Sequence, residues 1–171
     1  MTTTGPAGPR PDVTYHGFSP GIIVLEDDTG RQLGVLSPVL YHSPTGLNWG
    51  YGGSGAADCA RSLLINALGK QAAACPICDG TQLTVYDDTI PWPDGRGQGD
   101  FRPYCAEHDG PPEDLDPELS GKCFCNGGYR DLPYQRFKFA FVAGWPQDGE
   151  WTITRAEILT WLDAQPDWNL K

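Results

Sequence analysis

The sequence predicts an α+β fold: a small antiparallel sheet with two helices, plus a loop-rich zinc-binding insertion. Apolar β-branched runs and helical spacing of apolar residues occur on both sides of a middle stretch. That stretch holds five of the six cysteines and seven prolines, and it has no helical period. We therefore expect a flexible tail at residues 1–12, a core domain formed by residues 13–74 and 132–166, and a Cys-rich acidic insertion at residues 75–131.

The first half of the core domain is expected to contain a hairpin and a helix. Residues 21–37 predict an antiparallel hairpin, because two apolar runs flank the turn sequence DDTG. Residues 39–41 are compatible with a further short strand. Residues 56–68 predict a helix, since apolar side chains recur at helical spacing and Gly69 follows the last turn.

The second half of the core domain is expected to contain a strand and a helix. In residues 136–143, RFKFAFVA, phenylalanines alternate with other residues, which predicts a half-buried strand. Thr154 and Glu157 have the spacing of a capping box. A helix is therefore expected over about residues 155–164, ending before Pro166.

Composition and charge exclude several classes of protein. A net charge of −10 disfavours nucleic-acid binding, because such a surface repels a phosphate backbone. No apolar run is long enough for a membrane span, and the first residues lack the apolar core of a signal peptide. We expect a cytoplasmic protein, in which cysteines are better interpreted as metal ligands than as disulfides.

The insertion carries most of the negative charge. Residues 75–131 contain 12 acidic and four basic residues, which gives −8 of the total of −10. A segment of this composition buries little apolar surface, so another interaction has to order it. The acidic surface suggests either solubility alone or docking on a basic partner.

The cysteine spacing supplies that interaction. Cys75-x-x-Cys78 and Cys123-x-Cys125 are each followed, two residues on, by a glycine that allows a tight turn. Four thiolates satisfy the tetrahedral shell of a structural Zn²⁺ ion, so we favour these four as ligands. In a rival ligand set, Cys105 and His108 replace Cys123 and Cys125. An iron–sulfur cluster is a less favoured occupant of the site than zinc, because the cysteine spacings of ferredoxins are absent.

The glycine-rich loop at residues 42–55, HSPTGLNWGYGGSG, is a second candidate site. It leads directly into the first helix, where backbone N–H groups and the helix dipole favour an anion. It is no nucleotide-binding P-loop, because Ala56 and Ala57 stand where Lys and Ser or Thr are needed. The favoured interpretation of the glycines is tight packing, and the alternative is a ligand site. The candidate ligand-binding residues are His42, Ser43, Trp49, Gly53 and Ser54.

Residues 42–64, together with residues 137–162, resemble DUF6166, a family of unknown function found in bacteria and their phages. The sequence HSPTGLNWGYGGSGAADCARSLL carries the most specific part of this resemblance. Ala56 stands where the family pattern has proline, and the Cys-rich insertion is not part of that pattern. The resemblance implies a phage or mobile-element setting and assigns no activity.

We expect a non-enzymatic, zinc-stabilised protein-interaction module. It would be a phage or mobile-element accessory protein that docks through its acidic surface on a host or phage protein with a basic surface, in the host cytoplasm if it is phage-encoded. The alternative is a small-ligand, anion-binding or hydrolytic domain that uses residues 42–55. Sequence-specific nucleic-acid binding through the zinc loop would need a basic face that the sequence does not offer.

Overall fold

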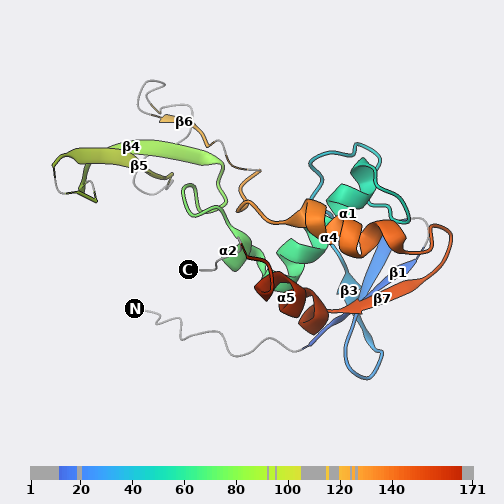
Figure 1. Cartoon of the computed structure of the whole chain (residues 1–171). Helices are drawn as coiled ribbons and strands as arrows, with labels where there is room; N and C mark the ends of the chain where they lie inside the picture. Colours follow the sequence, from blue (N-terminus) through green and yellow to red (C-terminus); the bar gives the residue numbers. More distant parts are fainter. Residues whose placement is uncertain are drawn as a thin grey trace. The chain divides into compact units, whose positions relative to one another are not determined.

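The computed structural model divides the chain into two compact units, Met1–Ala67 with Pro133–Lys171 (unit 1) and Leu68–Leu132 (unit 2). Both units contain an antiparallel sheet, and the fold is α+β as predicted (Figure 1). The described part of the chain forms four α-helices rather than the two expected. The described residues are 12–18, 21–91, 93–94, 96–104, 115, 120–123, 125 and 127–166.

Unit 1 contains a four-stranded sheet in the order β3-β2-β1-β7, with every neighbouring pair antiparallel. One face of the sheet carries the core, because alternate side chains such as Tyr15 and Ile23 are buried. The Tyr15 hydroxyl donates to Asn66 Oδ1 on helix α1 at 2.8 Å, so α1 packs against this face. The strands are β1 (Thr14–Phe18), β2 (Ile22–Glu26), β3 (Gln32–Val35) and β7 (Trp151–Thr154).

The predicted hairpin is confirmed by the pairing of β2 with β3. Its turn is held by the Asp27 carboxylate, which accepts the N–H groups of Thr29 and Arg31 at 3.0 and 2.9 Å. Gly30 has a φ of 80°, a conformation that glycine adopts without steric cost. Turn chemistry and apolar pattern therefore agree here, which is why the sequence alone located the hairpin.

The further strand suggested at residues 39–41 does not form. The N–H group of Val39 donates to Ser62 Oγ at 2.9 Å, and that of Tyr41 donates to Asp58 Oδ2 at 3.1 Å. Both acceptors lie on α1. Side chains of the helix therefore bind the N–H groups that a strand would offer to its neighbour.

Helix α1 (Ser54–Leu68) begins two residues before the predicted start. It is buried almost throughout, including Asp58 and Arg61, whereas an amphipathic surface helix would expose one face. It is therefore the central helix of unit 1.

The strand predicted at residues 136–143 is wrong: the chain forms helix α4 (Tyr134–Ala140), followed by a 3₁₀ turn, η2 (Val142–Gly144). Phe137 and Phe141 are four residues apart, and their ring centroids lie 4.9 Å from each other. A strand and a helix both place these two side chains on one side. Phe139 distinguishes the two, and it is 67% exposed.

Helix α5 (Arg155–Asp163) confirms the predicted capping box at Thr154 and Glu157. The Glu157 N–H donates to Thr154 Oγ1 at 3.1 Å, and the Glu157 carboxylate accepts the Thr154 N–H at 2.8 Å. Ile158 and Leu162 are fully buried. These two side chains anchor the helix, because each large aliphatic group removed from water stabilises the fold by about 1.5–3 kcal/mol.

Unit 2 is less loop-rich than predicted. A three-stranded antiparallel sheet in the order β5-β4-β6 occupies much of its described part. Strands β4 and β5 form a long hairpin in Figure 1. The elements are helix α2 (Lys70–Ala73), β4 (Leu83–Pro91), β5 (Gln98–Pro103) and β6 (Ser120–Lys122).

Within the described ranges, no helix is both long enough and apolar enough to span a bilayer.

Candidate metal centre

The first cysteine turn follows directly on α2. The N–H of Ile77 donates to Cys75 Sγ at 3.4 Å, and the N–H of Asp79 donates to the Cys75 carbonyl at 2.8 Å. Asp79 and Gly80 have positive φ angles of 47° and 83°. The chain therefore bends tightly after Cys78 and aims backbone N–H groups at sulfur, as expected of a Cys-x-x-Cys turn.

The second cysteine turn has the same local chemistry. The N–H of Gly128 donates to Cys125 Sγ at 3.3 Å, and the N–H of Gly127 donates to the Cys125 carbonyl at 2.9 Å. Both glycines have positive φ angles, of 62° and 87°. The N–H of Cys123 donates to the Gln82 carbonyl at 2.8 Å, which fixes the start of this turn beside the end of the first.

Backbone contacts hold the two turns together. The Cys75 N–H donates to the Gly128 carbonyl at 2.8 Å, and Ala74 forms an antiparallel bridge with Tyr129. A Cβ atom at Gly128 would lie 2.6 Å from the Gly80 carbonyl oxygen, so the turns meet backbone to backbone. Gly128 is thus required by close approach as well as by φ, whereas at Gly80 the positive φ alone favours glycine.

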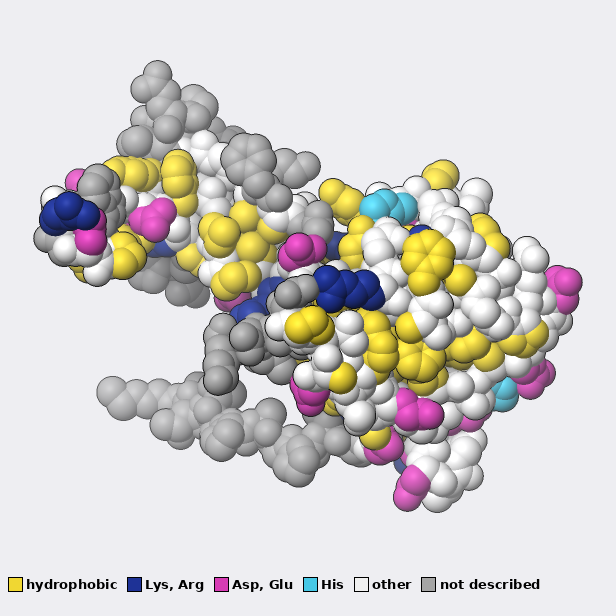
Figure 2. All heavy atoms as spheres, in the orientation of Figure 1, with side chains coloured by type: hydrophobic (Ala, Val, Ile, Leu, Met, Phe, Trp, Pro, Cys, Tyr) yellow, Lys and Arg dark blue, Asp and Glu magenta, His cyan; other side chains and the backbone are white. Residues whose placement is uncertain are grey.

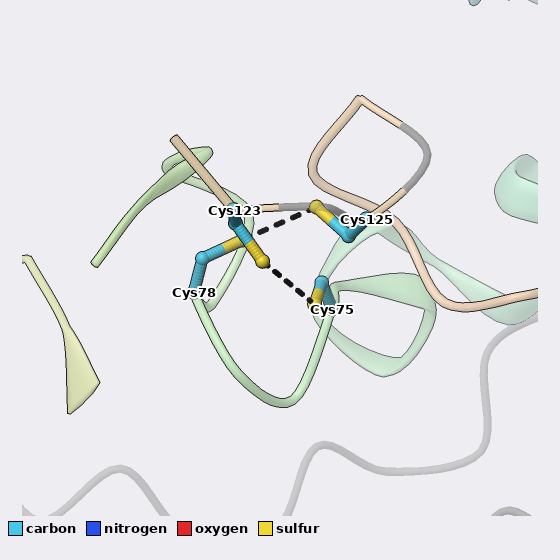
Figure 3. A group of neighbouring side chains, drawn as sticks. All are labelled: Cys75, Cys78, Cys123 and Cys125. Atoms are coloured by element: carbon cyan, nitrogen blue, oxygen red, sulfur yellow. Dashed lines mark hydrogen bonds between the residues drawn. The ribbon is translucent and has the colours of Figure 1, made fainter. Parts of the chain in front are cut away.

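The four thiols converge on one point, as Figure 3 shows. The Sγ atoms of Cys75 and Cys123 are 3.9 Å apart, and those of Cys78 and Cys125 are 3.6 Å apart. All four Sγ atoms lie within 4.8 Å of one another. A tetrahedron with metal–sulfur bonds of about 2.3 Å has edges of about 3.8 Å, so this arrangement could hold a metal ion. The separations are too long for disulfide bonds.

Burial opposes ionisation of these thiols. Burial raises the pKa of Cys125 to about 12. Hydrogen bonds with the neighbouring thiols also raise this pKa, and the hydrogen bond from the Gly128 N–H acts in the opposite sense. Burial also raises the pKa of Cys123. For Cys75 burial acts in the same sense, but hydrogen bonds from the N–H groups of Ile77 and Cys78 and from the Cys78 and Cys125 thiols together outweigh it and lower the pKa. Four close thiolates therefore need a cation, and a bound metal would supply that charge while protons are released.

The donor set restricts the chemistry of the site. Cys75, Cys78 and Cys123 are buried and Cys125 is half-buried, so the thiols face one another more than they face solvent. Four thiolates complete a tetrahedral shell and leave no position for water or substrate. This pattern is typical of a structural metal centre.

The rival pair of candidate metal ligands, Cys105 and His108, lies outside the described residues. Cys59 is fully buried on α1, and burial raises the pKa of its thiol, which makes it an unreactive core side chain.

In the glycine-rich loop, His42 and Ser43 contact other parts of unit 1. His42 Nε2 lies 2.8 Å from the Tyr134 hydroxyl, and the Ser43 hydroxyl lies 3.1 Å from that of Thr45. The N–H groups of both residues donate to the buried Asp58 carboxylate, at 3.0 and 2.7 Å. Asp58 therefore anchors the loop to α1. The sequence places this residue only within the predicted helix at residues 56–68.

The remaining loop candidates also make contacts within the fold. Trp49 is buried and packs edge-on against Trp151, with ring centroids 5.3 Å apart. The Gly53 carbonyl accepts the Ala57 N–H at 3.1 Å, and Ser54 begins α1. These contacts agree with a packing role for the loop, and a ligand site at residues 42–55 stays a prediction.

One comparison with known proteins gives a match. Residues 15–81 match the model of a family of unknown function, DUF6166, which agrees with the resemblance seen in residues 42–64. The matched range includes the first cysteine turn, with Cys75 and Cys78, and ends before the second. No curated protein and no solved structure matches the chain.

Proposed function

We propose that this chain is a non-enzymatic protein-interaction module whose unit 2 is ordered by a structural Zn²⁺ ion. The observation that supports it best is the convergence of Cys75, Cys78, Cys123 and Cys125, whose Sγ atoms lie within 4.8 Å of one another. Because unit 2 contains long polar and proline-rich segments, a metal would stabilise an arrangement that a small apolar core alone would not.

Zinc is the metal that best suits this donor set. Thiolate ligands in a closed tetrahedral shell favour zinc, iron or cuprous copper over magnesium, calcium or manganese. Zinc needs no redox partner and has no geometric preference that opposes a tetrahedron. Spacings of Cys-x-x-Cys and Cys-x-Cys do not match those of ferredoxin clusters.

A closed thiolate shell supports a structural role. Catalytic zinc centres keep a position for water or substrate, and their ligands usually include histidine or carboxylate. Here backbone N–H groups of Ile77 and Gly128 donate to Cys75 and Cys125, which fixes the thiolates and lowers their basicity. We therefore assign the metal to folding and not to a reaction.

The charge of unit 2 supports a basic protein partner. Residues 75–131 carry a net charge of −8. Such a surface attracts a positively charged protein and accelerates encounter with it, and salt weakens both effects. The partner would be a host or phage protein with a basic surface, in the reducing cytoplasm that a free thiol cluster requires. A phage or mobile-element accessory protein would fit this setting.

Charge-neutralised variants test the docking role. The variant Asp88→Asn/Asp100→Asn/Asp131→Asn removes three exposed acids from unit 2. The control Asp28→Asn/Asp148→Asn/Asp163→Asn removes three exposed acids from unit 1 and changes net charge equally. In affinity capture from bacterial lysate at increasing salt, we expect the first variant to lose bound proteins at lower salt than the wild type. Equal behaviour of both variants would contradict docking through unit 2.

A further inference from the structure

The β4–β5 hairpin exposes a pair of aromatic side chains on one face. Tyr86 and Phe101 are directly opposed across the two strands. Their ring centroids are 5.6 Å apart with an interplanar angle of 74°, and the residues are 38% and 47% exposed. A cross-strand aromatic pair stabilises a hairpin by about 0.2–1 kcal/mol. That benefit alone does not account for two large rings left in contact with solvent.

The backbone of β5 makes room for this pair. Gly99 has a φ of 109°, and a Cβ atom there would overlap the Tyr86 hydroxyl. The Tyr86 side chain therefore extends across β5 at Gly99 and does not point straight out from the sheet. Together with Phe101 it forms a continuous aromatic surface on this face.

The opposite face of the hairpin is charged, and one ion pair within the hairpin neutralises part of that charge. Val85 and Asp87 point to that face, because side chains alternate along a strand. Arg102, the register partner of Val85, donates from Nε to Asp87 Oδ2 at 3.1 Å. The guanidinium thus neutralises one acid on the charged face, and no Lys or Arg of the described strands β4 and β5 points to the aromatic face.

One uncompensated acid lies beside the aromatic pair. Asp88 is exposed, lies two residues along β4 from Tyr86, and forms no ion pair with another described residue. Asp100, the register partner of Asp87, lies on the charged face. Figure 2 shows hydrophobic side chains at the surface of this part of the molecule, with acidic side chains beside them. Ring faces attract cations, and neighbouring carboxylates increase that attraction. Phosphate groups would be repelled by the same acids.

We propose that the face of the β4–β5 hairpin bearing Tyr86 and Phe101 contacts an arginine-bearing segment of a basic protein partner. The inference rests on the proposed docking function and assigns that function to a surface. Arginine is the favoured cation because its guanidinium is planar, weakly hydrated and able to stack on a ring while bonding to a carboxylate. An ammonium group is more strongly hydrated and lacks the planar shape.

Defined peptides test the preference for arginine. The probes are two nine-residue peptides, each with three Arg-Gly-Ser or three Lys-Gly-Ser repeats, titrated into the zinc-loaded full chain at low salt. Calorimetry gives the Kd values, and ¹⁵N NMR locates the contact. The arginine peptide is expected to bind at least threefold more tightly than the lysine peptide and to shift the amide signals of Tyr86 and Phe101. Equal affinities would overturn the inference.

Substitutions test the aromatic pair itself. The variant Tyr86→Thr/Phe101→Thr places β-branched residues, which favour strands, at both positions, and is expected to bind the arginine peptide about fivefold more weakly. The swap Tyr86→Phe/Phe101→Tyr keeps both rings and should retain wild-type affinity, which separates loss of contact from loss of folding. Leu33 is an exposed strand residue of unit 1, so Leu33→Thr is the matched control and should leave the affinity for the arginine peptide unchanged.

The outcomes separate the two proposals. If the Thr/Thr variant binds the arginine peptide with wild-type affinity, the aromatic face is not the contact surface, although docking through unit 2 stands. If the wild type binds neither peptide at low salt, docking on a basic partner fails together with this inference.

Discussion

The Sγ atoms of Cys78 and Cys125 lie 3.6 Å apart although 47 residues separate them in the chain. The intervening residues include the β4–β5 hairpin, so the pair closes a long loop at its base. Loop closure of this length is entropically costly, and backbone contacts between the two turns offset only part of that cost. A metal ion shared by the two turns would supply the rest.

The cysteine cluster predicts a selective effect of thiol substitutions. Cys78→Ser should lower zinc affinity at least 100-fold, because a serine hydroxyl is a poor replacement for a thiolate ligand. Cys59→Ala is the control: this thiol is buried on α1 in unit 1, outside the cluster, and its removal should leave one zinc per chain. Native mass spectrometry measures the stoichiometry. Full zinc occupancy in Cys78→Ser would contradict the assigned ligand set.

Close approach of the two turns predicts a glycine requirement. Gly128→Ala places a Cβ atom 2.6 Å from the Gly80 carbonyl oxygen at a φ of 87°. Strain of this kind costs about 1–3 kcal/mol, so zinc affinity should fall about tenfold or more. Gly121→Ala is the matched control in the same unit, since no atom lies within 4 Å of its Cβ position. Competition with a chromophoric chelator measures both affinities; similar values would show that the turns can separate.

The buried Asp58 carboxylate predicts a large contribution to unit 1. It accepts N–H groups from Tyr41, His42 and Ser43. Asp58→Ala should lower the free energy of unfolding by about 3 kcal/mol, because buried donors are left without an acceptor. Urea denaturation followed by tryptophan fluorescence measures the change, with the exposed turn residue in Asp28→Ala as control. A loss no larger than that of the control would mean that water replaces the carboxylate.

The capping box predicts an acid-dependent loss of stability. Hydrogen bonds from the Thr154 N–H and hydroxyl lower the pKa of Glu157 below its ordinary value of 4.5. The folded state thus binds this proton more weakly than the unfolded state, so the stabilisation is present above about pH 4.5 and is lost as the pH falls through the lower, folded-state pKa. Between pH 7 and pH 3, wild type should lose more stability than Glu157→Gln. Thermal denaturation measures both proteins over this pH range. If the melting temperatures of wild type and Glu157→Gln fall by the same amount, this prediction is contradicted.

The sequence predicted the elements in which local signals agree. The β2–β3 hairpin combines apolar strands with a turn that Asp27 and Gly30 favour, and α5 begins at a capping box. The four cysteines also carry their own signal, because glycines after Cys78 and Cys125 permit the turns that bring the thiols together.

Other elements required information that local patterns lack. Helix α4 was mistaken for a strand because Phe137 and Phe141 lie on one side in either structure, and only the exposure of Phe139 separates the two. The sheet of unit 2 was missed because prolines and acids surround the run from Leu83 to Thr89. Its pairing with β5 depends on contacts distant in sequence. The role of Asp58 likewise depends on a loop that folds back over α1.

A combined measurement on the purified full chain under reducing conditions tests most directly whether zinc orders unit 2. X-ray absorption at the zinc edge gives the metal's ligands, and hydrogen exchange of the β4 and β5 amides is followed with and without a strong chelator. If zinc orders unit 2, the protein contains one zinc per chain with four sulfur ligands at about 2.3 Å, and its β4 and β5 amides lose protection when the metal is removed. Protein without stoichiometric metal, whose β4 and β5 amides exchange at the same rate with or without chelator, would contradict it.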